Sequence, residues 1–317
     1  MNLGTIVWLA SFPKSGNTWF RIFLAGLAAG EHGSVDINNL HQHLEAPGGI
    51  ASSRAEFEEA TMLDSGLLPC DDIDALRPRV HEWTAARARE ERWIKVHDAW
   101  TLTSLGEPML GRNTARAAIY LVRDPRDVAV SLASHNNTSI QKAIELMNAP
   151  DGALNPGGRG HLTPQLRQKL AGWSGHVTSW LDQTSVPVLP VRYEDLVADP
   201  LAGFGAALAF VGREAGEAAI KRAVQRADFA ELQRQEKAHG FRERTSGSEP
   251  FFRVGRANAW REVLTEDQVR AIEDPHAAVM TRMGYSLSLR SLGPAPEGLL
   301  RSAENVARIP GLLRVSA

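Results

Sequence analysis

The segment from residue 5 to residue 29 constrains the fold of this chain more than any other. Thr5 to Ala10 is a short apolar run rich in strand-forming residues, which predicts a buried β-strand. The loop at 11–17, SFPKSGN, follows it, and the apolar spacing from Thr18 to Ala29 predicts a helix. A strand, a glycine-containing loop and a helix in this order open a parallel α/β sheet.

The rest of the chain repeats this alternation. Strands are predicted at 93–97, 117–122 and 186–193. Helices are predicted at 55–62, 71–91, 125–133, 163–182 with Thr163 as N-cap, 216–239, and from 200 and 265 onward, with a loop at 240–259. We therefore predict an α/β fold: a doubly wound, mainly parallel sheet with helices on both faces. Ligands bind beyond the carboxyl ends of such strands, which brings together the segments 11–19, 95–97, 123–131 and 193–195.

Composition sets the broad class of the protein. The chain has 317 residues and a formal net charge of -2, so no basic field indicates nucleic acid or a membrane surface as a partner. No apolar run reaches the roughly 18 residues of a membrane helix, no secretory signal precedes the first strand, and the single cysteine, Cys70, fits a reducing compartment. We expect a cytoplasmic protein with one domain over residues 1–288. Residues 289–317 contain prolines and no strong period, and we expect a C-terminal appendage there.

The loop at 11–17 has the features of a phosphate site. Backbone N–H groups at a helix N-terminus bind anions, Lys14 adds a positive charge, and Ser15, Asn17 and Thr18 add side-chain donors. The loop is P-loop-like, but it is not a Walker A loop, because Lys14 precedes its only glycine.

Two segments carry a resemblance to a known family. Residues 11–19, SFPKSGNTW, resemble the loop that binds the 5′-phosphosulfate in cytosolic sulfotransferases, and Asn17 keeps an amide donor where the family has threonine. Residues 123–131, RDPRDVAVS, resemble the family's 3′-phosphate segment, in which an arginine and a serine hold that phosphate; here they are Arg123 and Ser131. The resemblance implies a soluble, bacterial-like sulfotransferase that uses 3′-phosphoadenosine 5′-phosphosulfate (PAPS) and releases PAP.

Further segments match the family in the same order along the chain. Tyr193 stands in a Y-E-D-L context where the family has a purine-contacting tyrosine, and Phe229 resembles an aromatic residue of the adenine pocket. Residues 251–255, FFRVG, resemble the F-x-R-K-G loop that closes over the 3′-phosphate; Val254 replaces its lysine, and Arg256 is a candidate substitute. The residues that the resemblance assigns to PAPS are Lys14, Ser15, Gly16, Asn17, Thr18, Trp19, Arg123, Ser131, Tyr193, Phe229, Phe251, Arg253, Val254 and Gly255.

The second predicted strand ends in the sequence KVH. The two-residue period of a strand places Lys95 and His97 on the same face. The resembling segment of the family is K-T/S-H, whose histidine is the catalytic base, and an ordinary pKa of about 6.5 suits histidine to that role. Lys14 and Lys95 would stabilise the charge that builds on the leaving phosphate, with no metal ion. Asp98 and His135 are the alternative bases.

Two other functions stay open on the sequence alone. A P-loop-type nucleotide kinase would need a Walker A loop and a carboxylate for Mg²⁺ at a strand end, whereas Arg123 ends the strongest strand, with Asp124 beside it. A PAPS- or PAP-binding protein that has lost catalysis would not need both Lys14 and His97. The expected partner is a small-molecule hydroxyl acceptor of unspecified identity, and the oligomeric state stays open.

Overall fold

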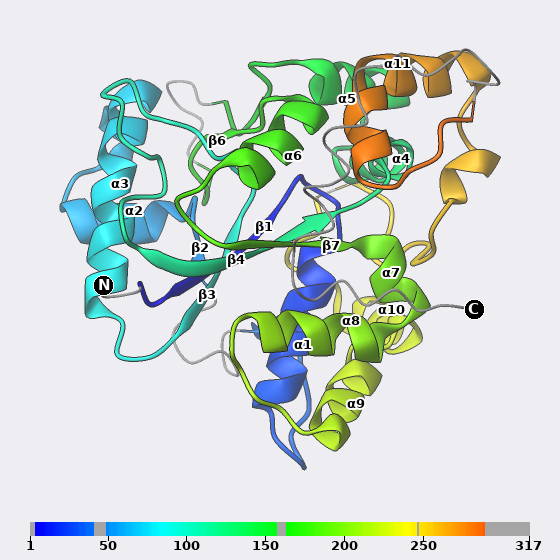
Figure 1. Ribbon diagram of the computed structural model, residues 1–317, viewed down its shortest axis with the longest axis horizontal. Coiled ribbons are helices and arrows are strands. Elements are labelled where there is room, and N and C mark those ends of the chain that lie inside the picture. The colour runs from blue at the N-terminus through cyan, green and yellow to red at the C-terminus, as the bar shows by residue number, and fades with distance from the viewer. Residues whose placement is uncertain (1–3, 41–48, 157–162, 246, 289–317) are drawn as a thin grey trace.

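The computed structural model describes residues 4–40, 49–156, 163–245 and 247–288. A sheet of five parallel strands lies at its centre, in the order β2-β3-β1-β4-β7 (Figure 1). The strands are β1 (Ile6–Ser11), β2 (Gly49–Ile50), β3 (Arg92–Val96), β4 (Ala115–Val122) and β7 (Val188–Arg192). Strands are added on both sides of β1, so the predicted doubly wound parallel sheet is confirmed.

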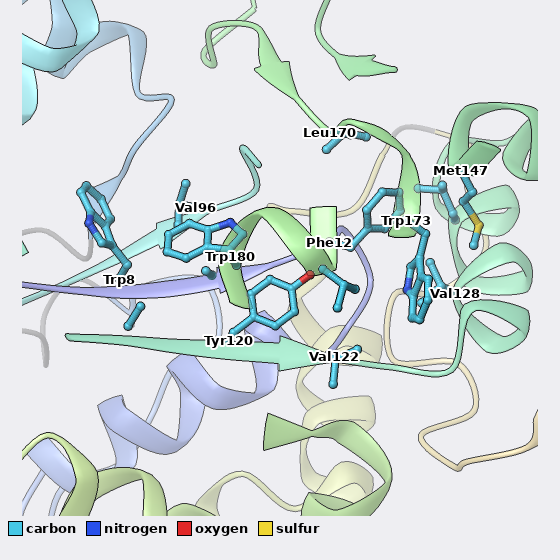
Figure 2. Packing of buried hydrophobic residues seen from close by; sticks show 14 of the residues in the cluster. Trp8, Phe12, Val96, Tyr120, Val122, Val128, Met147, Leu170, Trp173 and Trp180 are labelled. Atoms are coloured by element: carbon cyan, nitrogen blue, oxygen red, sulfur yellow. The ribbon is translucent and has the colours of Figure 1, made fainter. Parts of the chain in front are cut away.

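Alternate residues of each strand face opposite sides of the sheet, and each side has its own core. One face carries Trp8 and Tyr120, which pack with Trp173 and Trp180; all four side chains are fully buried (Figure 2). The helices on this face are α4 (Pro125–His135), α5 (Ile140–Asn148), α6 (Gly172–Asp182) and α11 (Glu266–Arg282).

The opposite face carries Val7, Leu9 and Ile119, which pack against a cluster of phenylalanines that includes Phe20 and Phe204. The helices that cover it are α1 (Asn17–Ala28), α8 (Pro200–Phe210) and α9 (Glu217–Arg226), with α10 (Phe229–His239) beyond them (Figure 1). Helices on both faces were predicted, and the two cores show why: the central strands β1 and β4 carry apolar side chains on both sides.

The remaining elements are short or lie at the edge of the sheet. They are α2 (Arg54–Thr61), η2 (Ser65–Leu67), α3 (Cys70–Arg87), α7 (Tyr193–Ala198), η3 (Ala259–Glu262) and the antiparallel pair β5 (Ala153–Leu154) and β6 (Gln168–Lys169). α2 and α3 share a small core of Phe57, Ile73 and Val80.

Side-chain caps fix the starts of the helices that were predicted from residues 200 and 265 onward. The Asp199 side chain accepts a hydrogen bond from the Ala202 N–H at the start of α8. Thr265 forms a capping box with Gln268 at the start of α11. The predicted helix at 216–239 is in fact two helices, because Asp228 accepts from two N–H groups of the next turn and starts α10 afresh.

The predicted helix over 163–182 is wrong in its first half. α6 begins at Gly172, and the residues before it run extended past neighbouring segments. The Leu166 N–H donates to the Ser52 carbonyl at 2.7 Å, and the Leu170 N–H donates to the Gly152 carbonyl at 2.8 Å. These long-range hydrogen bonds outweigh the local signal of Thr163 and the proline after it.

The predicted appendage at 289–317 lies outside the described residues, so the domain boundary at 288 stays a prediction. Within the described part of the chain, each helix is too short or too polar to cross a membrane.

Candidate active site

A cavity of about 1020 Å³ lies beyond the carboxyl ends of the central strands. Residues from the loop after β1, the end of β3, the start of α4, α7 and the loop at 240–259 line it together. All residues predicted for the site line this cavity except Ser15. The Ser15 side chain is buried, and its hydroxyl has no hydrogen-bond partner among the described residues.

The loop after β1 is held by its own side chains. Lys14 has a left-handed backbone with φ 69°, and Gly16 has φ 101°. A Cβ atom on Gly16 would lie 2.8 Å from the Tyr193 ring, so glycine is required there. The Asn17 amide donates to the Leu9 carbonyl at 2.8 Å and to the Ser11 hydroxyl at 3.2 Å. The expectation that this amide is a free donor for a ligand is therefore corrected: it braces the loop.

Lys14 lines the cavity, where burial and nearby positive charges disfavour its charged form. Its Nζ atom lies 3.7 Å from the centre of the Phe251 ring, an attractive cation–π contact. Burial, followed by the positive charges of Lys95 and Arg123, lowers the pKa of Lys14 to about 7. A bound anion would therefore stabilise the charged form of Lys14.

Lys95 has an acidic partner that the sequence did not suggest. Its Nζ atom lies 3.7 Å from Glu243 Oε2, and Arg21 Nη1 lies 2.5 Å from Glu243 Oε1. Burial lowers the pKa of Lys95, whereas Glu243 opposes that shift. Burial would raise the pKa of Glu243, but Lys95 and Arg21 outweigh it and hold this pKa far below its usual range. Glu243 and Glu249 are the two carboxylates of an arginine-rich loop, and no local spacing singles out Glu243.

His97 lies at the end of β3 with one ring nitrogen fixed by the backbone. Its Nδ1 atom lies 2.8 Å from the Ser11 carbonyl oxygen and 3.2 Å from the Ser11 hydroxyl. A carbonyl oxygen can only accept, so Nδ1 carries the hydrogen and Nε2 keeps a free lone pair. Burial and the charge of Lys95 lower the pKa of His97 well below 6.5. The ring is therefore neutral and basic at Nε2.

A second histidine holds the backbone of His97 from behind. His176 Nε2 donates to the His97 carbonyl at 3.0 Å, and Tyr120 donates its hydroxyl to His176 Nδ1 at 2.8 Å. All three residues are buried. This chain of hydrogen bonds fixes the end of β3 in the core of the domain.

The two alternative bases differ in position. Asp98 is fully buried and binds Arg77 through both carboxylate oxygens, at 2.9 Å and 2.6 Å, and it does not line the cavity. His135 does line the cavity, at the end of α4, and its ring meets Phe251 edge to face. Burial and the charges of the two lysines lower the pKa of His135 to about 4. Asp98 is thus a structural residue, whereas His135 faces the site.

Arg123 leaves β4 at the cavity and is held from two sides. Its Nη1 donates to the Lys14 carbonyl at 3.2 Å, and its guanidinium lies 4.4 Å from the centre of the Tyr193 ring. Its buried Nε has no partner among the described residues. Ser131 lines the same cavity from α4. The predicted arginine and serine therefore share one cavity.

Aromatic side chains form the far wall of the cavity. Trp19 donates its indole N–H to the Ala227 carbonyl at 2.9 Å and meets Tyr193 edge to face. Phe229 begins α10 and packs against Gly255, where φ is 65° and an added Cβ would lie 2.5 Å from its ring. This wall offers flat apolar surfaces of the kind on which a base stacks.

In the loop that follows α10, residues 253–255 line the cavity as predicted, whereas Arg256 does not. Arg253, Val254 and Gly255 line the cavity, and Val254 offers no charge where the family has lysine. Arg256 pairs with Glu262 and does not line the cavity, so the expectation that it replaces the missing lysine is wrong. No group of three or more metal-ligating side chains is found among the described residues.

Comparison with curated proteins finds sulfotransferases. Luciferin sulfotransferase of Photinus pyralis is 23% identical over 230 residues, which is 71% of this chain and 55% of the relative. The match thus spans about half the length of that protein. "Sulfotransferase 1A1" of Canis lupus familiaris is 25% identical over 285 residues, which is 88% of this chain and 84% of the relative.

Solved structures of two proteins in complex with PAP share the fold. The mouse sulfotransferase SULT7A1 complexed with PAP superposes with a TM-score of 0.55 at 19% identity, over 87% of this chain and 84% of that one. Retinol dehydratase in a complex with retinol and PAP gives 0.53 at 20% identity, over 92% and 84%. The model of the family described as "Sulfotransferase domain" matches residues 5–284. With nearly the whole described chain inside that match, the protein belongs to the sulfotransferase family.

Proposed function

We propose that the protein transfers the sulfuryl group of PAPS to a hydroxyl group of a small-molecule acceptor. The observation that carries this proposal is that Lys14, Lys95 and His97 line one cavity with the loop after β1. Family membership and the PAP bound in the solved relatives support it.

The residues of the cavity fit PAPS in three places. The start of α1 and Lys14 offer N–H groups and a cation for the 5′-phosphosulfate. Arg123 and Ser131 offer a planar fork and a hydroxyl for the 3′-phosphate. The wall of Trp19 and Phe229 offers a place for adenine.

His97 performs the proton transfer in the proposed reaction. Its free Nε2 takes the proton of the acceptor hydroxyl as that oxygen forms a bond to sulfur. The bond from sulfur to the bridging oxygen breaks, and the electron pair stays on the 5′-phosphate of PAP. Lys14 and Lys95 stabilise the negative charge that develops there.

The kinase alternative has less support. The carboxylate beside Arg123 is Asp124, and it is engaged with Arg126, whose Nη2 lies 2.6 Å from Asp124 Oδ2. Transfer from PAPS that is insensitive to added Mg²⁺ or EDTA supports the sulfotransferase, whereas Mg²⁺-dependent transfer from ATP supports the kinase.

Replacement of His97 tests the mechanism. General base catalysis contributes typically 10²–10⁴-fold, so His97→Ala and His97→Asn should lose at least about 10²-fold in single-turnover transfer while PAP affinity is retained. Near-wild-type transfer in either variant would move the base to His135.

The pH profile of the wild type is a second test of His97. Because the pKa of His97 is depressed, its basic form persists as the pH falls, and kcat/KM of the wild type should fall only well below pH 6.5.

A further inference from the structure

Glu243 connects three parts of the site. One carboxylate oxygen lies 2.5 Å from Arg21 Nη1 on α1, and the other lies 3.2 Å from the Thr18 hydroxyl and 3.7 Å from Lys95 Nζ. Arg21 is buried, and Glu243 is partly buried at the cavity. The contacts reach the carboxylate from α1 and from β3, so it has little freedom to move.

The charges around Lys95 explain why this carboxylate matters. Within the described part of the chain, Glu243 is the acidic group that forms an ion pair with Lys95. Five titratable or charged groups interact electrostatically with Lys95. They are Arg21 on α1, Lys14 in the loop after β1, His97 at the end of β3, His135 on α4 and Glu243 in the loop at 240–259. All except Glu243 are cations or become cations on protonation.

We propose that Glu243, anchored by Arg21, is a positioning residue for sulfuryl transfer that holds the Lys95 ammonium group in place and keeps it charged. The proposal rests on the proposed function, in which Lys95 stabilises the leaving phosphate. It adds a residue from the loop at 240–259 to the machinery of the reaction.

Burial makes the charge of Lys95 depend on its neighbours. Burial lowers the pKa of Lys95, and Arg21 lowers it further, whereas Glu243 raises it. The same carboxylate also opposes the lowered pKa of Lys14. Without Glu243, cations would face one another in a poorly solvated site, and Lys95 would lose its proton at a lower pH than it does in the wild type. A neutral Lys95 cannot stabilise the charge on the leaving oxygen.

Arg21 offsets the negative charge of Glu243, which would otherwise repel an anionic substrate. A free carboxylate would repel PAPS, but the charge of Glu243 is shared with Arg21, so the three groups together keep a net positive charge. Glu243 should therefore affect turnover through Lys95 more than it affects PAP affinity.

The pH dependence of turnover tests the proposal. Loss of an opposite charge at this distance lowers the pKa of a lysine by about one unit or more. The loss of turnover in Glu243→Gln should therefore be small at low pH, where Lys95 is charged in both proteins, and should grow to roughly tenfold as the pH rises. PAP affinity at the lower pH should stay close to wild type. Glu214→Gln, an exposed glutamate outside the cavity, is the matched control. A uniform loss across the pH range would overturn the proposal.

A double-mutant cycle separates this role from a merely structural one. If Glu243 acts mainly through Lys95, Glu243→Gln should cost much less turnover in the Lys95→Ala background than in the wild type, and only the smaller effect on Lys14 should remain. Additive losses would contradict the proposal. Glu243→Asp, which keeps a charge beside Arg21, should show a smaller pH effect than Glu243→Gln and serves if the latter does not fold.

Direct titration of Lys95 gives a readout that needs no activity. In protein with isotope-labelled lysine, Lys95→Arg assigns the NMR signal, and Glu243→Gln should move its titration to lower pH. An unmoved titration would overturn the proposal. If the wild type titrates as expected but transfers nothing from PAPS, the proposed function fails while the link between Glu243 and Lys95 stands.

Discussion

Burial lowers the pKa of Lys14 and of His97, with opposite consequences for catalysis. For His97 the lower pKa favours the neutral ring, which is the form that accepts a proton. For Lys14 it favours the neutral amine, which is the form that binds anions poorly. The site therefore contains a base that is ready before substrate binds and a cation that becomes fully charged only when an anion arrives.

Proton uptake on PAP binding follows from the pKa of Lys14. With a pKa of about 7 in the free protein, the amine is mostly neutral at about pH 8 and mostly charged at about pH 6. Bound phosphate raises that pKa, so PAP binding should take up close to one proton at the higher pH and far less at the lower. Affinity should correspondingly weaken as pH rises above 7.

Calorimetry in buffers of different ionisation enthalpy measures this uptake. Lys14→Arg is the informative variant, because arginine stays charged throughout the range. It should bind PAP with little proton uptake, apart from any contribution of Lys95. Equal uptake in the wild type and in Lys14→Arg would show that another group titrates.

Among the helices and strands, the local sequence pattern predicted most of the fold. It did not predict the features that depend on contacts between residues far apart in sequence. β1, β3, β4 and β7 were predicted because each is an apolar run, and the rule for parallel strand ends then placed Lys95, His97 and Arg123 at one edge. The two-residue strands β2, β5 and β6 were not predicted, because they are too short to give a pattern. The segment at 163–171 was wrong because its hydrogen bonds go to residues far away in sequence. Glu243 was missed for the same reason: its partner Thr18 lies 225 positions away.

Gly255, in the loop at 240–259, lies directly against the Phe229 ring. Gly255→Ala would place a Cβ atom 2.5 Å from the Phe229 ring and push that ring from the wall of the cavity. PAP affinity should fall by roughly tenfold, the size of effect expected when one stacking contact of about 1–3 kcal/mol is disturbed. Gly247→Ala is the matched control, since it has a similar φ of 77° but its nearest neighbour lies at 3.7 Å. Both variants carry backbone strain, so equal affinities in the two would contradict the assigned role of Phe229.

At the scale of the whole molecule, the cavity joins parts of the chain that are far apart in sequence. Its lining residues extend from Pro13 to Ala259 and come from elements on both faces of the central sheet (Figure 1). A ligand that contacts all of them must stabilise the arrangement of both cores. Binding is therefore coupled to the stability of the whole domain and not to that of one loop.

Thermal unfolding with and without PAP tests this coupling. PAP at 100 times its Kd should stabilise the folded state by about 2.7 kcal/mol, which raises Tm by several degrees for a domain of this size. Arg123→Ala removes a charged contact worth about 1.5–3 kcal/mol, so at the same PAP concentration about half of that increase or more should disappear. Adenosine 5′-phosphosulfate, which has no 3′-phosphate, should stabilise the wild type and Arg123→Ala alike. If the variant lost equal stabilisation by both ligands, Arg123 would not read the 3′-phosphate, and the fit of PAPS to the cavity would have to be reversed or abandoned.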